Sequence, residues 1–456
     1  MVKNSREIAY FSTNTSSLSR IIRRTALSRA CAIAAISAAT VNAQTQGEDG
    51  EVIEEIVTTG IRGSIQRSID LKQTSNSIVE AVSAEDLGKL PDTSIADSIS
   101  RLPGLTSQRA EGRASAISLR GTDPGFTTAL LNGREQVSTG DNRSVEFDQY
   151  PSELLNSVLV YKTPDSNLIG QGLAGTIDLR TVRPLDYGNR AIAMNIRGEM
   201  NGNDSLGADS DDMGSRISFS YIDQFADGKV GLAVGYARLD APLATQGIGT
   251  YEPWGAVNKG NPDWNADVPE GTFTTNGMKV RTDMGSTERN GVMAALQFAP
   301  TDNYSGIIDL YYSTMDQTNN ARSLEVNLGD YPAVCCDGPW PPGTQFGYSN
   351  VTVENNTVVA GDVLQVVPLA RNFLFLTEDE ILSTGFNNEF FLNDDWSLIA
   401  DLSYSKATRE QDQFETQAQY VPQSSDPTLP ANQYDTATFR LNGTSSMPTL
   451  GFGMDY

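Results

Sequence analysis

The chain has 456 residues, with 33 lysines and arginines, 57 aspartates and glutamates and no histidine, which gives a formal charge of −24. The lack of histidine excludes Ser–His and Cys–His nucleophiles, histidine metal ligands and histidine pH switches. The acidic excess argues against a nucleic-acid partner, because such a partner binds a basic face. No run of about 18 apolar residues is present, so no membrane-spanning helix is predicted.

The first 43 residues have the pattern of an export signal. Arginines precede an apolar, alanine-rich run over residues 30–41, and small residues follow up to Ala43. A basic head, an apolar centre and a small-residue exit are the three parts of a secretory signal peptide. We expect residues 1–43 to be this peptide, cleaved after Ala43, and the rest of the chain to be exported. A short N-terminal helix of a cytosolic domain is the alternative.

Removal of the signal leaves two cysteines, Cys335 and Cys336, which are adjacent in the sequence. Adjacent cysteines rarely bind one metal, because their side chains diverge, and we expect neither a metal site nor a cofactor. In an oxidising compartment one interpretation is a strained disulfide between the two cysteines, and another is a disulfide to a cysteine of another chain. Two ordinary loop thiols are the other interpretation.

Residues 44–60 form a polar, acidic leader that ends in the patch Ile56, Val57, Thr58, Thr59 and Gly60. Isoleucine, valine and threonine favour β-strands. A short β-favouring patch in a leader can add itself as an edge strand to the sheet of a partner. Patches of this length are common, so an ordinary linker is the alternative.

Residues 61–185 have the mixed pattern of a compact α/β domain. Ser83–Asp86 has the form of a helix capping box. A second helix is predicted to open at Pro91-Asp92-Thr93 and to end at Pro103-Gly104. Its apolar residues Ile95, Ile99 and Leu102 share one face.

The second half of this domain is predicted to contain a tight turn, a helix and two strands. Asn132-Gly133 lies between apolar residues and is a strong signal for a tight turn. A helix is predicted to begin at Pro151. The strands are expected at residues 157–161 and 176–181.

Several motifs together resemble a known family. The run EEIVTTG at 54–60 resembles the TonB box of outer-membrane TonB-dependent receptors. Five further stretches resemble the plug domain of that family: NSIVEAVSAEDLGKLPDTSIADSISRLPGL (76–105), SLRG (118–121), LLNGRE (130–135), YPSELLNSVLVYKTP (150–164) and GLAGTIDLRT (172–181). The motifs follow the order and spacing of the family. The residues of these motifs are similar to those of the proteobacterial branch of receptors tied to complex carbohydrates.

After residue 185 the sequence alternates between apolar and small or polar residues in seven segments. They begin near Ile192, Ile217, Val230, Val292, Tyr304, Leu382 and Trp396, and residues 436–441 are a candidate eighth. Alternation with one apolar face over about 8 to 12 residues suits tilted membrane strands.

The links between these segments alternate in length. Short links are predicted at 223–229, 300–303 and 393–395, and long ones at 201–214, 240–290, 316–380 and 407–434. An outer-membrane barrel has short periplasmic turns and long outer loops. A soluble β-sandwich, the alternative, has no reason to place every long loop at one end.

The predicted fold class is an α+β plug domain followed by an antiparallel transmembrane β-barrel that is incomplete in this chain. A plugged transporter has about 22 strands, so we expect residues 186–456 to hold the first seven or eight. The domains are then a signal peptide (1–43), a leader with the TonB box (44–60), a plug (61–185) and the start of the barrel.

The resemblance implies active uptake through the outer membrane, with the C-terminal domain of TonB, outer-membrane lipid and a ligand as partners. It assigns coupling to TonB to residues Glu55, Ile56, Val57, Thr58, Thr59 and Gly60. The plug fold and its contact with the barrel are assigned to Arg120, Gly121, Asn132, Gly133, Gly172 and Gly175. No acid–base constellation stands out, so an enzyme is not expected.

The ligand is predicted from the two longest links. They contain Trp254, Trp264 and Trp340, whose faces suit sugar rings. Nine acids between residues 316 and 380 would repel an anionic ferric chelate. A neutral oligosaccharide is therefore expected, with a ferric siderophore or cobalamin as the alternative within the family. A passive porin and a secreted carbohydrate-binding or adhesion protein are the alternatives of other classes.

Overall fold

The computed structural model describes most of the chain after the leader. The described residues are 56–83, 94–110, 113–166, 168, 172–187, 190–207, 210–250, 255–256, 268–275, 277–328, 347–366, 368–393, 395–419, 435–443 and 448–453. The signal peptide with Ala43, the leader up to Glu55, the tryptophans Trp254, Trp264 and Trp340, and the two adjacent cysteines lie outside these residues. From Val57 onward the chain is one unit.

The N-terminal domain (residues 56–187) is a mixed α/β domain built around a five-stranded sheet. Its first half contains α2 (Ile56–Thr74), β1 (Val79–Ser83), α3 (Ile95–Ser100), β2 (Leu105–Ala110), β3 (Arg113–Leu119) and the 3-10 turn η1 (Pro124–Phe126). Its second half contains β4 (Thr127–Leu131), β5 (Arg134–Glu135), the 3-10 turns η2 (Phe147–Gln149) and η3 (Ser152–Leu154), β6 (Ser157–Tyr161), β7 (Gly175–Arg180) and α4 (Pro184–Tyr187).

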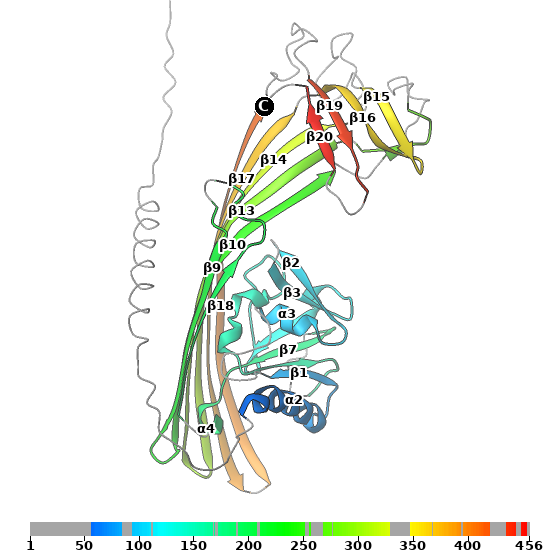
Figure 1. The fold of residues 1–456 in the computed structure, drawn as a ribbon. Helices are drawn as coiled ribbons and strands as arrows, with labels where there is room; N and C mark the ends of the chain where they lie inside the picture. The colour runs from blue at the N-terminus through cyan, green and yellow to red at the C-terminus, as the bar shows by residue number, and fades with distance from the viewer. Residues whose placement is uncertain are drawn as a thin grey trace, which may run out of the picture. The chain divides into compact units, whose positions relative to one another are not determined.

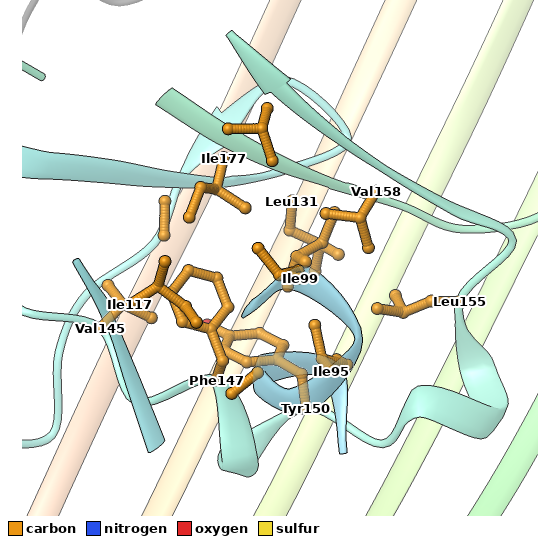
Figure 2. Packing of buried hydrophobic residues seen from close by; sticks show 14 of the residues in the cluster. Ile95, Ile99, Ile117, Leu131, Val145, Phe147, Tyr150, Leu155, Val158 and Ile177 are labelled. Carbon is orange, nitrogen blue, oxygen red and sulfur yellow. The ribbon is translucent and has the colours of Figure 1, made fainter. Parts of the chain in front are cut away.

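The sheet has the order β1-β6-β7-β4-β5, and β2 and β3 form a separate hairpin. Within the five-stranded sheet β4 and β7 are parallel, and the other neighbours are antiparallel. Helix α3 covers the core (Figure 2), where Ile95 and Ile99 are fully buried among Ile117, Val158 and Ile177. The predicted apolar face of this helix is therefore confirmed.

Two local predictions for this domain need correction. Helix α3 begins at Ile95 rather than at Pro91, because the side chain of Ser94 caps it by accepting a hydrogen bond from the Asp97 amide at 3.0 Å. The helix predicted after Pro151 is only the single turn η3. It cannot continue, because Leu155 is already extended (φ −101°, ψ 143°) and leads directly into β6.

The second part of the chain contains a sheet of seven long antiparallel strands, called the wall below (Figure 1). Its order is β18-β17-β14-β13-β10-β9-β8. The strands are β8 (Ala191–Met200), β9 (Met213–Phe225), β10 (Val230–Thr250), β13 (Gly277–Thr301), β14 (Tyr304–Asn327), β17 (Leu369–Asn393) and β18 (Trp396–Gln419). All seven predicted strands, and the three short turns between them, are confirmed.

The strands are much longer than predicted, and this corrects the long links. Much of the predicted links 240–290 and 316–380 belongs to β10, β13, β14 and β17. Hydrophobic alternation marked only part of each strand, because the rest carries polar residues on both faces. The acids of the predicted link 316–380 therefore do not form a single patch of negative charge, because Asp316 and Asp379 point to opposite faces of the wall.

The candidate eighth strand belongs to a different sheet. Residues 435–440 form β19, which pairs with β16 rather than with β18. This second sheet contains β11 (Gly255–Ala256), β12 (Phe273–Thr274), β15 (Gly347–Glu354), β16 (Thr357–Val366), β19 (Asp435–Arg440) and β20 (Thr449–Phe452). Tyr348, Val363 and Phe439 form its core together with Met278 of β13 and Val326 of β14.

The wall has two chemically different faces. The inner face contacts the N-terminal domain, and its residues on β10 include the buried Ala233, Ala237 and Leu239. The outer face carries large apolar residues that are exposed in the described part of the chain. They include Ile192, Met194, Ile217, Phe219, Tyr236, Leu296, Ile308, Leu310, Tyr312, Phe390, Leu398, Leu402 and Tyr404. We call this apolar set the outer band.

Above the outer band lies a row of acids in direct register across five strands. Asp240 is opposite Glu288, Glu288 is opposite Asp316, Asp316 is opposite Glu378, and Glu378 is opposite Glu410. Like charges placed directly opposite one another destabilise a sheet. This row is therefore a source of strain above the outer band.

Removing one charge from the middle of the row should stabilise the wall. Glu378→Gln is expected to raise the free energy of unfolding by about 0.5 kcal/mol, because two like-charge contacts disappear. Denaturant unfolding of the full chain in detergent measures it. Glu380→Gln is the matched control, since its cross-strand neighbours are Thr314 and Thr408. An equal effect of both substitutions would contradict the interpretation.

Candidate functional site

The N-terminal domain approaches the inner face of the wall where that face lacks side chains. A Cβ atom at Gly235 would lie 2.6 Å from Cδ2 of Leu154, and one at Gly291 would lie 2.6 Å from Cγ of Pro151. Any larger residue would push the domain away at these two positions. The small residues that alternate along β10 and β13 therefore serve the fit between the domain and the wall.

Apolar packing continues from the domain into the wall. Tyr150, which follows η2, stacks on Tyr311 of β14 with ring centroids 5.1 Å apart. Met293 and Ile381 of the wall belong to the same buried cluster as the core of the domain. Burial, with a smaller contribution from the neighbouring Tyr311, raises the pKa of Tyr150 well above its ordinary value, so it remains a neutral hydrogen-bonding group. The two parts share one core.

The strongest polar contact between the domain and the wall is made by Arg134 of β5. Its Nε and Nη2 donate to Asp401 at 2.9 Å each, and its Nη1 donates to Asp309 at 2.6 Å. Arg183 donates to the other oxygen of Asp309 at 2.8 Å. Burial lowers the pKa of Arg134, but these hydrogen bonds outweigh burial and raise it above its ordinary value. A Cβ atom at Gly385 would collide with the guanidinium group.

The tight turn before Arg134 aims this side chain at the wall. Asn132 (φ +54°) and Gly133 (φ +79°) both have left-handed backbone conformations. The amide of Gly133 donates to Asp178 at 2.9 Å, and the side chain of Asn132 bonds to Thr181. The predicted turn residues hold the fold, and the residue that follows them reaches the wall.

A second polar contact involves η2. The Nε2 of Gln149 donates to Oδ2 of Asp379 on β17 at 2.6 Å. Arg409 of β18 donates to both oxygens of the same carboxylate at 2.7 Å, and also to the hydroxyl of Thr139 at 3.1 Å. The main-chain oxygen of Gln149 accepts from the hydroxyl of Tyr311 at 2.9 Å. Asp379 is thus shared between the domain and the wall.

A cavity of about 500 Å³ lies between the domain and the inner face of the wall. Its charged residues are Arg109, Arg281, Arg409, Glu146 and Asp148. Amides and hydroxyls, together with Met315 and Phe375, make up most of the remaining lining. The cavity can accept a polar ligand with one apolar face.

Helix α2 docks on the domain through few and mostly polar contacts. The hydroxyl of Ser64 donates to the main-chain oxygen of Ser83 at 2.6 Å, and Lys72 pairs with Glu80 at 2.6 Å. Ile65 and Ile69 are 55% and 40% exposed, so little apolar area holds the helix. The helix is therefore weakly attached compared with α3.

The sequence-predicted coupling residues lie at the start of this helix. Residues 56–60 are helical in α2, and Glu55 lies outside the described residues. Pairing of this patch with a partner as an edge strand remains a prediction. The run of helix-forming residues from Gln66 to Lys72 extends helical structure back into the patch, whose own β preference is weak.

The predicted structural residues of the domain occupy turns and close contacts. Arg120 (φ +56°) and Gly121 (φ +73°) form a turn after β3, where the Arg120 amide donates to Gly104 at 2.7 Å. A Cβ at Gly172 would collide with the main chain of Gly175, and one at Gly175 with the side chain of Leu119. These residues lie in turns or close main-chain contacts of the domain, whereas the side chains that reach the wall's acids include Arg134, Arg183 and Gln149.

Two negative findings concern the described residues. Among them, no group of three or more histidines, cysteines or carboxylates could hold a metal ion. Of the helices in the described ranges, none has the length and apolar character needed to cross a membrane.

Comparison with known proteins gives a family match for part of the N-terminal domain. Residues 71–177 match the family model of the TonB-dependent Receptor Plug Domain. Among solved structures, the chain is similar to a mutant ferric enterobactin receptor from Pseudomonas aeruginosa in complex with enterobactin, with 11% identity, 80% of this chain and 62% of that chain covered, and a TM-score of 0.30.

Two further structures have comparable scores. The ferric yersiniabactin uptake receptor FyuA from Yersinia pestis is 13% identical, with 80% of this chain and 62% of that chain covered and a TM-score of 0.30. The unliganded ferric citrate transporter FecA is 11% identical, with 84% and 63% covered and a TM-score of 0.31. The chain spans less than two thirds of the length of these structures.

Removing Arg134 should loosen the contact between the domain and the wall. Arg134→Gln leaves Asp401 without its guanidinium partner and Asp309 with Arg183 alone, and we expect a loss of about 3 kcal/mol in the free energy of unfolding. Denaturant unfolding of the full chain measures the loss. Arg109→Gln is the control, because its pair with Asp97 is exposed and within the domain, so it should cost less than about 1 kcal/mol. Equal losses would contradict the prediction.

The attachment of α2 should weaken in acid. Burial raises the pKa of Glu80, but hydrogen bonds from Lys72 and Lys162 outweigh it and hold the pKa below its ordinary value. A carboxyl of this kind stabilises the fold above its unfolded pKa of about 4.3, and the stabilisation is lost as the pH falls through the folded pKa. A spin label on Ile69→Cys, with Cys335 and Cys336 replaced by serine, should become more mobile below about pH 4.

The control for the acid response is Glu80→Gln. Its spin-label mobility should be raised already at pH 7 and should change little with acidification. If wild type and Glu80→Gln have the same pH profile, Glu80 does not hold the helix.

Proposed function

We propose that the chain, whose residues 71–177 match the TonB-dependent Receptor Plug Domain, takes part in the active uptake of a ligand through the outer membrane. Such a chain is a transporter component and not an enzyme. The observation that carries the proposal is the plug held on the inner face of the wall by Arg134, Asp309 and Asp401. A passive porin needs no domain bound in this way, and a secreted binding protein needs no outer band.

The outer band supports a location in lipid. On β14 its span from Tyr304 to Tyr312 is about 26 Å along a strand that rises about 3.3 Å per residue. Outer-membrane barrels have an apolar band about 25 Å tall with aromatic girdles. Tyr236, Tyr312 and Tyr404 lie on the outer face as a girdle would require. Export through the signal peptide of residues 1–43 belongs to this proposal.

Coupling to TonB is proposed for residues 54–60. Their pairing as an edge strand with the C-terminal domain of TonB would require residues 56–60 to leave the helical form they have in α2. Such a change leaves in place the contacts of α2 with Ser83 and Glu80, because these come from Ser64, Ser68 and Lys72. A pull on the patch would then reach β1 of the plug through the same contacts.

For the ligand, we propose an anionic ferric chelate rather than the oligosaccharide expected from the sequence. Three arginines line the cavity and can turn charge-assisted hydrogen bonds toward an anion, each from its carboxylate partner: Arg109 from Asp97, Arg281 from Asp283 and Arg409 from Asp379. The three solved structures named above are receptors or transporters of ferric siderophores and of ferric citrate. The aromatic residues that suggested a sugar lie outside the described residues, and the family match extends over plug domains without regard to the carbohydrate-type branch.

An oligosaccharide remains the second candidate, because amide side chains and Phe375 also line the cavity. Titration of the full chain with ferric citrate, ferric enterobactin and maltohexaose separates the two classes. We expect binding of a ferric chelate that weakens about tenfold in Arg281→Gln, since one charge-assisted hydrogen bond is lost. Binding of the sugar alone would overturn the ferric assignment and leave the transport proposal standing.

Removal of one backbone hydrogen-bond donor tests the role of residues 54–60 in coupling to TonB. Val57→Pro removes an amide donor that a paired strand needs, and we expect energised uptake to be lost while ligand binding stays unchanged. Val57→Thr keeps both the donor and the β preference and should retain uptake. Uptake of radiolabelled ferric citrate by cells with and without a proton-gradient uncoupler measures both. Full uptake by Val57→Pro would contradict the coupling role.

A further inference from the structure

Arg409 differs from the other cavity arginines in what its carboxylate partner touches. The carboxylate bound by Arg281 is Asp283, two residues away on the same strand. The carboxylate bound by Arg409 is Asp379, which also accepts from Gln149 of the plug. The side chain of Asp379 is fully buried, whereas that of Arg409 is 30% exposed. Arg409 thus faces both the cavity and the contact between plug and wall.

The negative charge of the buried Asp379 side chain is compensated by Arg409. Among the described residues, the hydrogen-bond partners of this carboxylate are the guanidinium of Arg409 and the neutral amide of Gln149. A buried carboxylate that loses its cation becomes an uncompensated charge, which is costly. Water then enters from the cavity to solvate Asp379 and competes with Gln149 of η2 for this carboxylate.

η2 is well placed to respond to such a change. Gln149 is fully buried, and the main-chain oxygen of this residue also accepts from Tyr311 and Ser313 of β14. The Oε1 atom of Gln149 has no hydrogen-bond partner among the described residues, so its amide is held on the wall side by Asp379 alone. Loss of the Asp379 contact therefore frees the side chain completely.

We propose that Arg409 is the positioning residue through which an anionic group in the cavity loosens the plug from the wall. A carboxylate or phosphate oxygen of the occupant draws the guanidinium away from Asp379, and the contact of Gln149 with Asp379 then opens. The inference deepens the proposed function, because it assigns to the ligand cavity the means by which occupancy reaches the plug.

The experiment is amide hydrogen exchange on the full chain in detergent, without TonB. The reporters are the amides of Gln149 and Tyr150, which donate to the main-chain oxygens of Glu146 and Phe147. Arg409→Gln imitates the withdrawn guanidinium and should speed exchange at these amides about tenfold. Arg281→Gln, on the same cavity wall, should leave their exchange unchanged.

A second variant separates charge from packing. In the double variant Arg409→Gln with Asp379→Asn, no buried charge is left uncompensated and residue 379 can still accept from Gln149. Exchange should return to within about threefold of wild type. If the double variant exchanges as fast as Arg409→Gln, or if Arg281→Gln matches Arg409→Gln, the proposal is overturned.

Inorganic phosphate is the probe for the anionic group. At 50 mM it should speed exchange of Gln149 and Tyr150 in wild type beyond the effect of sodium chloride at equal ionic strength, and it should add nothing in Arg409→Gln. An effect no larger than that of chloride overturns the role of the anion. Because these measurements use neither TonB nor uptake, their failure would leave the proposed transport intact, and a failure of uptake would leave them intact.

Discussion

The structure depends on the requirement that each strand of the wall satisfies two different environments at once. Successive side chains of a strand point to opposite faces, so Val234 and Tyr236 lie on the outer face while Gly235 and Ala237 meet the plug domain. The outer residues supply apolar area. The inner residues are small, or they carry a charge that the plug neutralises. A shift of register by one residue would exchange the two sets and destroy both contacts.

The plug is held by two kinds of contact, a shared apolar core and ion pairs. The two kinds respond differently when the domain moves away from the wall. Burial of Tyr150 against Tyr311 gives a contact that weakens gradually as the rings separate. The pairs of Arg134 with Asp309 and Asp401 depend on exact geometry and are lost within a short movement, because water then solvates each charge. Separation of the domain from the wall therefore breaks the ion pairs and also exposes the apolar residues of the shared core.

Much of this arrangement could be predicted from the sequence, and the rest depends on contacts between distant residues. Period-two alternation located all seven wall strands, and Asn132-Gly133 located the turn of the plug. Alternation could not give the strand ends, because residues such as Gln317 and Asn319 are polar on a face that lines a cavity. Helix α2 was missed because Ile56, Val57 and Thr58 favour strands locally. Arg134 belongs to a motif recognised from the sequence, but its partners Asp309 and Asp401 are more than 170 residues away.

The length of the wall strands beyond the outer band has a consequence for variation. From Tyr312 to Asn327, β14 continues for about 50 Å of strand, hydrogen-bonded on both sides. The second sheet, with its own core around Tyr348 and Phe439, is carried at this far end. The sequence at this end can vary with little effect elsewhere, since about 50 Å of paired strand separates a change there from the outer band and from the contacts of the plug domain with the wall.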